Sequence, residues 1–449
     1  MYISKTNFLV IGLAQSGFHA TKELLKRGAK CMVYDESEAP HILKNKEVLL
    51  TMGAVDAQSD VNSAVGWADV VVLSPGIPID HRLPVTAKRM KKRIIGELEL
   101  GSMLIRSPMV AVTGTNGKTT TCSLISSVLE KNGTKCLAVG NIGTPVCAHV
   151  DELDEDAVAV VEVSSFQLET VSSFCPHIAV LLNVTPDHLS RHYNMDNYVY
   201  LKRRILSNMR ESEFAVLNYD DEIISSFSDK IRCKPVFFST KHEVDGAYIS
   251  DGKLFFRGEY VMDKADVPLS GEHNVENVLA CICAAKLLKI ENGAIADGIK
   301  NFCGVKHRIE LIGEIEGIRF FNDSKATNVD ATVKALESMT EPTVVILGGK
   351  DKGLDFDKLF EEIAKSEVVH AVLTGETRFR MLESAKKCGF NDLTLTKNFE
   401  SAIKIAFMEC PTGGNVLLSP AASSFDMFSC FEERGEEFTR IVGNMNEEQ

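Results

Sequence analysis

The stretch PMVAVTGTNGKTTTCSLISSVLE, residues 108–130, decides how the rest of the chain is interpreted. Its apolar, β-branched run from Met109 to Val112 predicts a buried strand. A glycine-rich turn follows, and Gly133 stands where a helix C-cap glycine is expected. The stretch therefore predicts a strand, a turn and an amphipathic helix, whose apolar face consists of Leu124, Ile125, Val128 and Leu129.

The turn predicts a phosphate site. Glycine lets the backbone approach an anion, and the first N–H groups of a helix attract negative charge. Lys118 would reach the outer phosphates of a nucleotide, and the Thr119 hydroxyl would ligate magnesium. Only two residues separate Gly114 from Gly117, against four in the usual P-loop, and a plain strand–helix turn is the alternative. The predicted phosphate contacts are Gly114, Thr115, Asn116, Gly117, Lys118, Thr119 and Thr120.

Length and composition bound the class of protein. The 449 residues suffice for about three domains of ~150 residues. A net charge of −13 argues against a nucleic-acid-binding surface. No apolar run approaches ~18 residues and the opening residues predict a strand, so we expect neither a membrane span nor a signal peptide. The 12 scattered cysteines indicate reduced, buried thiols rather than zinc ligands or disulfides.

The first segment, residues 1–97, predicts a Rossmann-type βαβ unit from Phe8 onward. Ala14 stands where the dinucleotide fingerprint has its second glycine, which weakens the case for NAD. At the end of the next strand, Asp35 or Glu36 would bind a sugar hydroxyl or a base edge, or would simply face water. The turn Ser74-Pro75-Gly76 follows another buried strand, where ligands bind in open α/β sheets.

The middle segment, residues 98–308, places polar residues after further buried strands. Asn141 lies in a glycine-bracketed turn, and Glu162 ends an apolar run. A carboxylate there needs either a cation partner or a bound magnesium ion. Lys202, in a predicted helix, reads by itself as an ordinary surface lysine. Asn274 and Asn277 are one helical turn apart and would read an adenine edge or cap the helix.

The last segment, residues 309–449, repeats the strand-then-loop pattern and predicts a third doubly wound unit. Its polar loops make Lys352 and Ser424 candidates for binding a small acidic substrate, and Lys350 would serve equally well. The expected fold is three doubly wound α/β domains. They are a Rossmann-like N-terminal domain (1–97), a central P-loop-type ATPase domain (98–308) and a Rossmann-like C-terminal domain (309–449).

Several motifs, in this order, resemble those of the Mur ligase family across essentially the whole chain. The family signals are TGTNGKTT, GNIG, NVTPDH, GEHNVEN and HRIE. Three further stretches look like the branch of the family that adds D-glutamate: VSSFQLE, FNDSKATN and SPAASSFDMFSCFEERGEEF. The DNPR-type motif of the branch that adds diaminopimelate or lysine does not occur in the sequence.

The resemblance implies an ATP-dependent amide ligase. The γ-phosphate of ATP would pass to the carboxylate of UDP-N-acetylmuramoyl-L-alanine, and the amine of D-glutamate would attack the acyl phosphate. This reaction belongs to cytoplasmic peptidoglycan precursor synthesis, and so to cell-wall formation, cell shape and cell division. The resemblance also implies a monomer whose partners are these small molecules, without nucleic acid or membrane. It further implies that the third domain closes on the central one.

The resemblance assigns site roles residue by residue. It makes Lys118, His188 and Lys202 catalytic, with two Mg²⁺ ions on Thr119, Glu162, His188 and a CO₂-derived carbamate of Lys202. The implied nucleotide contacts beyond the turn are Asn274, Asn277, Arg308, Asp323 and Lys325. The implied UDP-substrate contacts are Gln15, Ser16, Asp35, Ser74, Gly76 and Asn141. The implied D-glutamate contacts are Thr327, Lys352, Ser424, Phe425 and Phe431. Glu36 and Phe425 depart from the Thr and Leu of the family pattern.

Three alternative functions are considered. A sister ligase would add another amino acid or use a different acceptor, as folylpolyglutamate synthase does, and amino-acid specificity distinguishes it. A nicotinamide oxidoreductase would use the first βαβ unit, but it leaves the phosphate turn without a role. A non-catalytic nucleotide-binding regulator would bind ATP through Lys118 and turn over nothing.

Overall fold

The computed structural model describes residues 2–447 except 59, 270 and 352, and its strands form sheets of five, nine and six strands. This confirms the predicted three-part α/β architecture. The first two sheets lie in one compact unit, Met1–Val267 with Glu276–Phe302. The third lies in a second unit, Pro268–Val275 with Cys303–Gln449.

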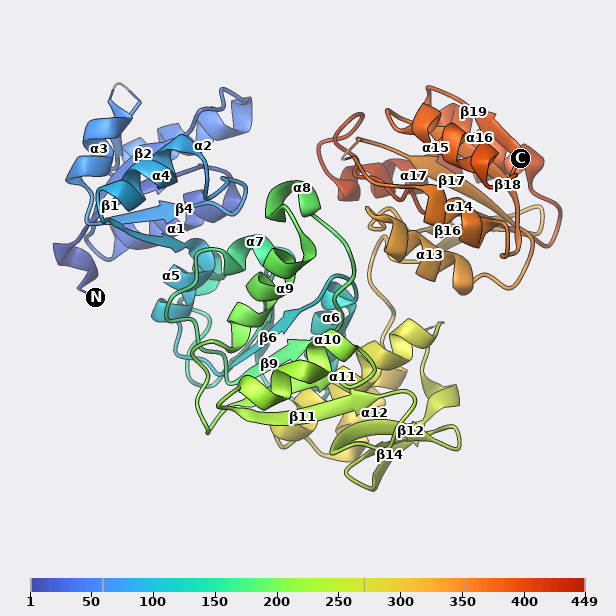
Figure 1. The fold of residues 1–449 in the computed structure, drawn as a ribbon, viewed down its shortest axis with the longest axis horizontal. Coiled ribbons are helices and arrows are strands. Elements are labelled where there is room, and N and C mark those ends of the chain that lie inside the picture. Colours follow the sequence, from blue (N-terminus) through green and yellow to red (C-terminus); the bar gives the residue numbers. More distant parts are fainter. Residues whose placement is uncertain (1, 59, 270, 352, 448–449) are drawn as a thin grey trace. The chain divides into compact units, whose positions relative to one another are not determined.

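The first sheet is parallel throughout, in the order β3-β2-β1-β4-β5. Phe8 and Val10 of β1 enter one apolar core, while Leu9 and Ile11 enter another. Successive strand residues point to opposite faces, so both faces are buried, which explains the uninterrupted apolar runs. The elements are β1 (Asn7–Ile11), α1 (Gln15–Lys26), β2 (Lys30–Tyr34), α2 (Pro40–Thr51), β3 (Val55–Asp56), α3 (Val61–Trp67), β4 (Val70–Leu73), α4 (Arg82–Arg89), β5 (Arg93–Gly96) and α5 (Glu97–Leu104) (Figure 1).

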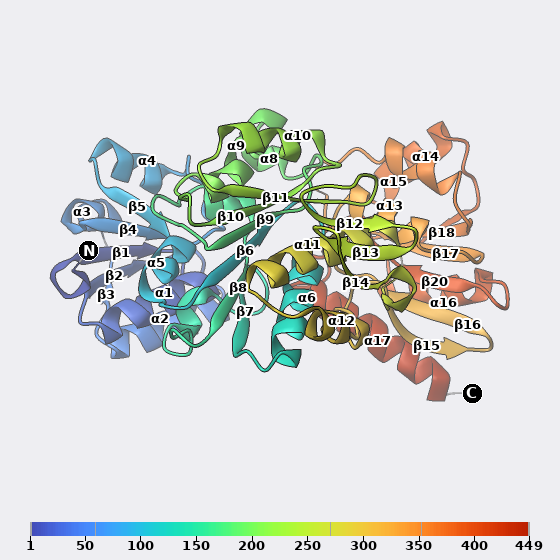
Figure 2. The ribbon, with the colours of Figure 1, turned by 90° about the horizontal axis from the view of Figure 1, so that it is seen from below.

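The central sheet has the order β14-β13-β12-β11-β10-β9-β6-β8-β7, with β6 between β8 and β9 (Figure 2). These three strands are parallel, and Val112 lies opposite Glu162 while Thr113 lies opposite Leu181. The turn after β6, Glu162 and the chain after β9 therefore meet at one edge, where ligands bind in such sheets. The parallel strands are β6 (Met109–Thr113), β7 (Cys136–Gly140), β8 (Val158–Glu162), β9 (Ile178–Leu181), β10 (Phe214–Asn218), β11 (Lys234–Ser239) and β12 (Gly246–Ser250).

The helices of the central region include the one predicted after the phosphate turn. Helix α6 (Lys118–Lys131) buries the expected apolar face, and Gly133 beyond its end has φ +75°. The other helices are α7 (Ser165–Leu168), α8 (Leu189–His192), α9 (Met195–Arg203), α10 (Glu222–Ser225), α11 (Glu272–Leu287) and α12 (Asn292–Lys300), with short 3₁₀ turns that include η2 (Val146–His149), η3 (Arg204–Leu206) and η4 (Ser226–Lys230).

One part of the central sheet was not predicted from the sequence. Strands β13 (Lys253–Phe256) and β14 (Glu259–Asp263) continue the sheet from β12 in antiparallel fashion. They make a meander at its edge, whereas the sequence suggested only parallel strands alternating with helices. Their connections are short turns at Asp251-Gly252 and Arg257-Gly258, where all four residues have positive φ. Such turns join antiparallel strands.

The second unit contains the third sheet, in the order β15-β16-β20-β17-β18-β19. Only β15 pairs antiparallel to its neighbour. Val344 and Ile346 of β17 face one core, and Val345 and Leu347 face the other. The elements are β15 (Glu310–Ile315), β16 (Ile318–Asn322), α13 (Val329–Glu337), β17 (Thr343–Gly348), α14 (Asp357–Ile363), β18 (Val368–Thr374), α15 (Arg378–Lys387), β19 (Leu393–Leu395), α16 (Phe399–Glu409), β20 (Asn415–Leu418) and α17 (Phe431–Glu447).

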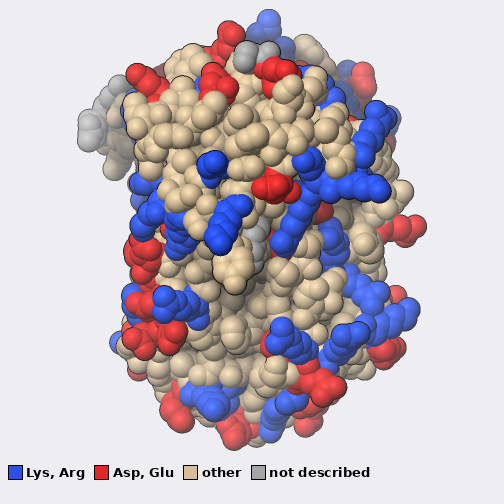
Figure 3. Space-filling view, turned by 90° about the vertical axis from the view of Figure 1, so that its left-hand side faces the viewer, with Lys and Arg blue, Asp and Glu red and all other residues tan. Residues whose placement is uncertain are grey.

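The surface and the helices bear on two expected absences. On the face drawn in Figure 3, Lys and Arg side chains are interspersed with Asp and Glu side chains. Within the described residues, no helix has the length and apolar character needed to cross a membrane.

Candidate active site

The turn after β6 is shaped by a glycine in the left-handed region. Gly117 has φ +83° and caps the start of α6. A Cβ atom at this position would lie 2.3 Å from Oδ1 of Asn277. A side chain at residue 117 would therefore be strained and would displace Asn277, so the turn needs glycine. The N–H groups of the first turn of α6 have no partner within the helix, which makes this end a natural anion site.

Asn183, which follows β9, holds the turn in place. Its Oδ1 accepts a hydrogen bond from the Asn116 N–H at 2.8 Å, and its Nδ2 donates to the Asn116 carbonyl at 3.2 Å. The Thr115 hydroxyl donates to the Thr185 carbonyl and lies 3.1 Å from the Tyr198 hydroxyl. The turn is therefore preorganised by side chains from a neighbouring strand end and from α9. Asn183 and Tyr198 are functional residues that the sequence reasoning missed.

Lys118 lies across the turn that it belongs to. Its Nζ donates to the carbonyls of Gly114 at 3.0 Å and Thr115 at 2.7 Å. Both acceptors belong to the predicted phosphate contacts, so the ammonium group lies where the charge of a nucleotide would be received. Thr120 is buried in the first turn of α6, directly after Thr119.

Thr119 and Glu162 meet as the sequence predicted. The Thr119 hydroxyl donates to Oε2 of Glu162 at 2.7 Å, and Nδ2 of Asn141 donates to Oε1 at 2.7 Å. Glu162 is buried at the end of β8. These oxygens are the hard donors that Mg²⁺ prefers, so the pair fits a magnesium ion. Among the described residues, no group of three or more His, Cys, Asp and Glu side chains forms a metal cluster.

Lys202 is not a surface lysine, and this corrects the reading of its helix from sequence alone. It is 2% exposed in α9, and its Nζ lies 4.6 Å from the centre of the Tyr198 ring. Burial, reinforced by the positive charge of Lys118, holds the pKa of the Lys202 amine well below its usual range. The direction follows from the cost of desolvating the ammonium form in this place, which favours the neutral amine.

His188 stands at the start of α8 with φ +54°, and its Nε2 lies 3.6 Å from Oδ2 of Asp187. Its ring lies 4.7 Å from that of Phe166. The nearby His192 is buried, and its Nε2 lies 2.9 Å from the Ser165 hydroxyl. Burial, followed by the charge of His188, lowers the pKa of His192 to about 4. His192 is therefore a neutral supporting residue of α8, while His188 is the more exposed histidine.

Arg191 of α8 connects this edge to the first sheet. Its Nε and Nη2 donate to the two carboxylate oxygens of Glu169 at 3.0 and 2.6 Å. Its guanidinium also donates to three carbonyls of the turn after β4, at 3.4 Å to Pro75, 3.4 Å to Gly76 and 3.1 Å to Ile77. A bidentate arginine is geometrically specific. Arg191 therefore fixes the turn after β4 relative to α8, a role that no sequence pattern indicated.

The turn after β1 is closed by the protein itself. A Cβ atom on Gly17 would lie 1.7 Å from the Gly12 carbonyl, and the Ser74 hydroxyl donates to the same carbonyl at 2.8 Å. The Asp35 carboxylate accepts from the Leu13 N–H at 2.6 Å and from the Ser37 N–H at 2.8 Å. Asp35 is therefore not a residue that merely faces water. Gln15 and Ser16 begin α1 beside this turn.

Glu36, Asn274 and Asn277 each had two interpretations from the sequence. Glu36 pairs with Arg82 at 2.8 Å and so is engaged by the protein at the end of β2. Asn277 of α11 accepts from the Thr121 hydroxyl at 3.3 Å. Asn274 is buried in the first turn of the same helix. Neither asparagine is thereby assigned to adenine or to capping, and both expectations stay open.

In the second unit, Asp323 directly follows β16 in a fully buried position. Burial raises the pKa of its carboxyl to about 6, although Arg308, whose Nη1 is 4.0 Å away, favours the charged form. The Ser419 hydroxyl donates to Oδ2 of Asp323 at 2.7 Å. The Lys325 ammonium lies 4.9 Å from the centre of the Phe431 ring. Two predicted nucleotide contacts, Asp323 and Arg308, thus lie together.

The predicted D-glutamate contacts differ in how far they are exposed. Thr327 is half-buried and Ser424 is buried, whereas Phe425 is 64% exposed. Lys352 lies outside the described residues, and the alternative Lys350 pairs with Glu376 at 2.9 Å. A buried Arg434, which sequence reasoning missed, donates from Nε to the Ser324 hydroxyl at 2.9 Å and from Nη1 to the Ala422 carbonyl at 3.1 Å. It joins the two loops that carry the predicted contacts.

Three family models match consecutive parts of the chain. The Mur ligase MurD-like N-terminal domain matches residues 6–96, the Mur ligase middle domain matches 112–285, and the Mur ligase glutamate ligase domain matches 307–422. Seven of the 12 cysteines are buried, four are partly buried, and Cys303 is exposed.

Curated relatives extend over nearly the full length. The chain is 40% identical to the UDP-N-acetylmuramoylalanine–D-glutamate ligase of Thermoanaerobacter sp., covering 99% of this chain and 100% of the relative. It is 41% identical to the ligase of the same name from Pelotomaculum thermopropionicum, covering 98% of each chain. For the one from Clostridioides difficile the identity is 39%, covering 97% of this chain and 98% of the relative.

Solved structures share the fold at low sequence identity. The UDP-N-acetylmuramate-alanine ligase MurC from Thermotoga maritima has a TM-score of 0.63 at 18% identity, covering 98% of this chain and 100% of that one. MurF ligase from the same organism, in complex with ADP, has a TM-score of 0.60 at 14% identity, covering 99% and 100%. From the three domain matches and the full-length relatives, we conclude that the chain belongs to the Mur ligase family.

Proposed function

We propose that this chain joins D-glutamate to UDP-N-acetylmuramoyl-L-alanine at the expense of ATP, in peptidoglycan precursor synthesis. The observation that carries the proposal is the identity of about 40% over nearly the whole chain to ligases named for this reaction. The phosphate turn, Lys118 and the Thr119–Glu162 pair supply an ATP site of the kind that the reaction needs. We place this reaction in the cytoplasm and expect a monomer that acts on small molecules.

The proposed reaction has two steps. The carboxylate of the L-alanine residue attacks the γ-phosphorus of ATP, which forms an acyl phosphate and releases ADP. The amine of D-glutamate then attacks the acyl carbon, and the tetrahedral intermediate collapses to the amide and inorganic phosphate as the amine loses its protons. Carboxylate and triphosphate repel each other, so Lys118 and the N–H groups of α6 would offset charge while the groups are held in line.

Two magnesium ions would be held at the edge of the central sheet. Thr119 and Glu162 would hold the first, since their oxygens already lie 2.7 Å apart. His188 and a carbamate of Lys202 would hold the second. Bound Mg²⁺ would supply charge neutralisation between phosphates and carboxylate. The role of Asn141 would change with the ion, because it now donates to the other oxygen of Glu162.

The environment of Lys202 supports carbamylation. Only a neutral amine attacks CO₂, and the pKa of the Lys202 amine is held well below its usual range by burial. The new N–C bond forms as the neutral amine loses one proton, and the buried side chain becomes an anionic oxygen ligand. Lys202→Ala should greatly lower activity, which short carboxylic acids but not chloride should partly restore. Full activity in this variant would contradict the carbamate role.

The remaining ligand contacts are proposed from the positions that match the family motifs. Adenine and ribose would meet Asn274, Asn277, Arg308, Asp323 and Lys325, and the UDP-sugar would meet Gln15, Ser16, Asp35, Ser74, Gly76 and Asn141. D-Glutamate would meet Thr327, Lys352, Ser424, Phe425 and Phe431. We propose domain limits at residues 1–97, 98–308 and 309–449 for these three functions.

The decisive experiment is an amino-acid specificity assay. Purified protein receives ATP, Mg²⁺ and UDP-N-acetylmuramoyl-L-alanine, with D-glutamate, L-glutamate, L-lysine or diaminopimelate supplied singly. We expect phosphate release and an amide product, identified by mass spectrometry, with D-glutamate alone. Amide formation with L-lysine or diaminopimelate but not with D-glutamate would show that the chain is a sister ligase. Nucleotide binding without turnover on any of them would favour the regulator.

A further inference from the structure

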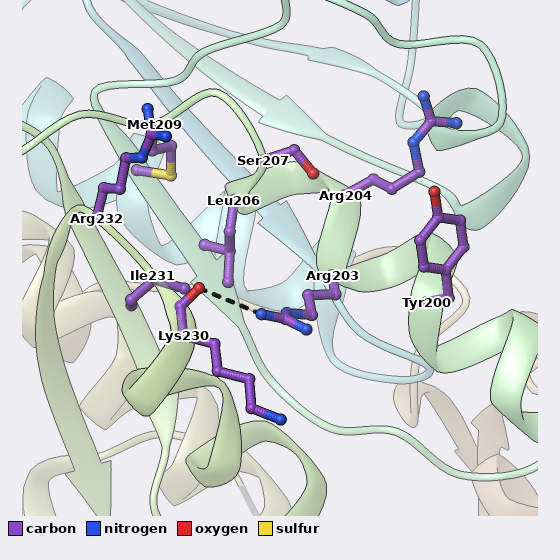
Figure 4. Close-up of a pocket in the computed structure, with 9 residues that line it drawn as sticks. All are labelled: Tyr200, Arg203, Arg204, Leu206, Ser207, Met209, Lys230, Ile231 and Arg232. Carbon is purple, nitrogen blue, oxygen red and sulfur yellow. Dashed lines mark hydrogen bonds between the residues drawn. The ribbon is translucent and has the colours of Figure 1, made fainter.

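A cavity of about 310 Å³ opens in the central region at the end of α9 and is separate from the phosphate turn (Figure 4). Its walls come from α9, η3, the chain after η3 and the end of η4. No residue that we assign to ATP, metal or substrate lines it. The lining residues are Tyr200, Arg203, Arg204, Leu206, Ser207, Met209, Lys230, Ile231 and Arg232.

The lining is basic and contains no carboxylate. Four of the nine residues are Lys or Arg, in a chain whose net charge is −13. Within the described part of the chain, none of these four side chains forms an ion pair with Asp or Glu. Other arginines do, as Arg82 pairs with Glu36 and Arg191 with Glu169. Lys230 and Arg232 are exposed, and Figure 4 draws their charged ends on opposite sides of the cavity, so an anion between them would have to bring these side chains together.

The cations are not equally available. Arg204 is used by the fold, because its guanidinium donates to the carbonyls of Glu169, at 2.7 Å, and Val171. Arg203 is oriented by one hydrogen bond to the Lys230 carbonyl at 3.2 Å, drawn dashed in Figure 4, and lies over the ring of Phe227. It keeps further N–H donors. Arg203, Lys230 and Arg232 are therefore the groups that would meet an anion.

The other lining residues limit the class of ligand. Tyr200 and Ser207 add two hydroxyl groups, while Leu206, Met209 and Ile231 form an apolar part. A volume of about 310 Å³ is at the small end of ligand pockets. Arginine with lysine recognises phosphate by fork-shaped hydrogen bonding and by point charge.

We propose that this cavity binds a small phosphate-bearing anion at a site distinct from the ATP site. The ligand class is a phosphate or diphosphate ester whose charged end meets Arg203, Lys230 and Arg232. Arg203 directly follows Lys202 in the chain, so an anion here would lie at the helix end that carries the active-site lysine. The site needs no contribution from the second unit.

The test uses inorganic pyrophosphate as the probe and hydrogen exchange, resolved by peptide mass spectrometry, as the readout. The full-length protein is titrated without Mg²⁺, and NaCl keeps the ionic strength constant. We expect protection of peptides covering residues 199–209 and 228–233, with half-maximal effect at millimolar pyrophosphate or below. Because the readout is local, binding at the phosphate turn is recorded separately, in peptides that cover residues 113–121.

A charge-reversed variant and a matched control complete the test. Lys230→Glu with Arg232→Glu should raise the half-maximal concentration at least about tenfold for these peptides only. Arg210→Glu, an exposed arginine nearby that does not line the cavity, should leave it unchanged. If the reversed variant does not fold, Lys230→Gln with Arg232→Gln replaces it. No protection at these peptides, or equal protection in the reversed and control variants, would overturn the proposal.

Discussion

The turns after β6 and β1 each follow a strand that lies between two parallel neighbours, yet they treat their polar groups in opposite ways. In the turn after β1, the Leu13 N–H is occupied by the Asp35 carboxylate, and Gly17 leaves no room above the Gly12 carbonyl. In the turn after β6, Asn183 supports the loop at Asn116 and the Lys118 ammonium donates to the Gly114 and Thr115 carbonyls, while the first N–H groups of α6 have no partner within the helix. The lesson is that glycines alone do not make a phosphate site. What matters is whether the protein has already satisfied the donors.

The same contrast recurs within one helix, α5. Glu99 accepts five hydrogen bonds, from the N–H groups of Ser172, Ser173 and Phe174 and from both serine hydroxyls. Burial raises the pKa of Glu99, but these hydrogen bonds outweigh it and lower the pKa overall. Glu97 accepts one bond, from the Cys147 N–H at 2.6 Å, and its Oε2 has no partner among the described residues. Burial raises the pKa of Glu97 to about 7.

The largest effect should follow from removing the cation of the open turn. Lys118→Ala should lower kcat/KM about 1000-fold, because a preorganised charge that faces the transferred phosphate is lost. Lys131→Ala, at the exposed end of the same helix, is the matched control and should stay near wild type. Phosphate release measures both, with thermal unfolding to confirm the fold. A loss below about tenfold would mean that the helix start alone holds the triphosphate.

The two carboxyl groups of α5 should respond oppositely to amidation at pH 8. The folded pKa of Glu97 lies above its unfolded value, so its stabilising contribution is complete below about pH 4.5 and is lost as pH rises through 7. Glu97→Gln should therefore raise the free energy of unfolding at pH 8 by up to about 3 kcal/mol and bring little at pH 4.5. Urea unfolding at both pH values checks this.

Glu99→Gln is the counterpart of that variant. It replaces a satisfied carboxylate, so it should lower the free energy of unfolding at pH 8 by about 3 kcal/mol. If Glu97→Gln and Glu99→Gln shift the free energy of unfolding in the same direction, hydrogen bonding does not decide whether these two carboxyl groups are protonated or ionised.

The closed turn should be intolerant of a single methyl group. Gly17→Ala places a Cβ against the Gly12 carbonyl and should cost about 2 kcal/mol of stability. Gly76→Ala is the control, since a Cβ there meets nothing within 4 Å and should change stability by less than about 0.5 kcal/mol. Denaturant midpoints compare the two. Equal stability would show that the turn is looser than its contacts indicate.

We expect the smallest of these effects at Arg191, which links α8 to the turn after β4. Arg191→Ala removes the hydrogen bonds to the turn after β4, so we expect KM for UDP-N-acetylmuramoyl-L-alanine to rise about tenfold with a smaller change in kcat. Arg191→Lys should recover part of the loss. Steady-state kinetics with each substrate varied in turn measures the split. A fall in kcat alone would place Arg191 in the chemical step instead.

The sequence predicted local secondary structure well, but it did not predict hydrogen bonds between side chains that are far apart in the chain. The strand, turn and helix at residues 108–130 follow from residue spacing, whereas the pairing of Thr119 with Glu162 was implied by the family resemblance. Asn183 and Arg191 escaped notice because their partners are far away in the chain, and a lone amide or arginine carries no periodic signal. Lys202 was read as a surface lysine for a different reason: i, i+4 spacing places it beside Tyr198 on α9, but it does not say that this face of the helix is buried.

The closed turn after β1 also limits how this chain could be redesigned. Ala14→Gly would restore the glycine spacing of a dinucleotide fingerprint, yet a pyrophosphate would still meet the Asp35 carboxylate where it needs the Leu13 N–H. Removing that carboxylate would leave the Ser74 side chain against the Gly12 carbonyl. Gaining a nicotinamide activity therefore requires coordinated substitutions, and no single mutation leads from this turn toward an oxidoreductase.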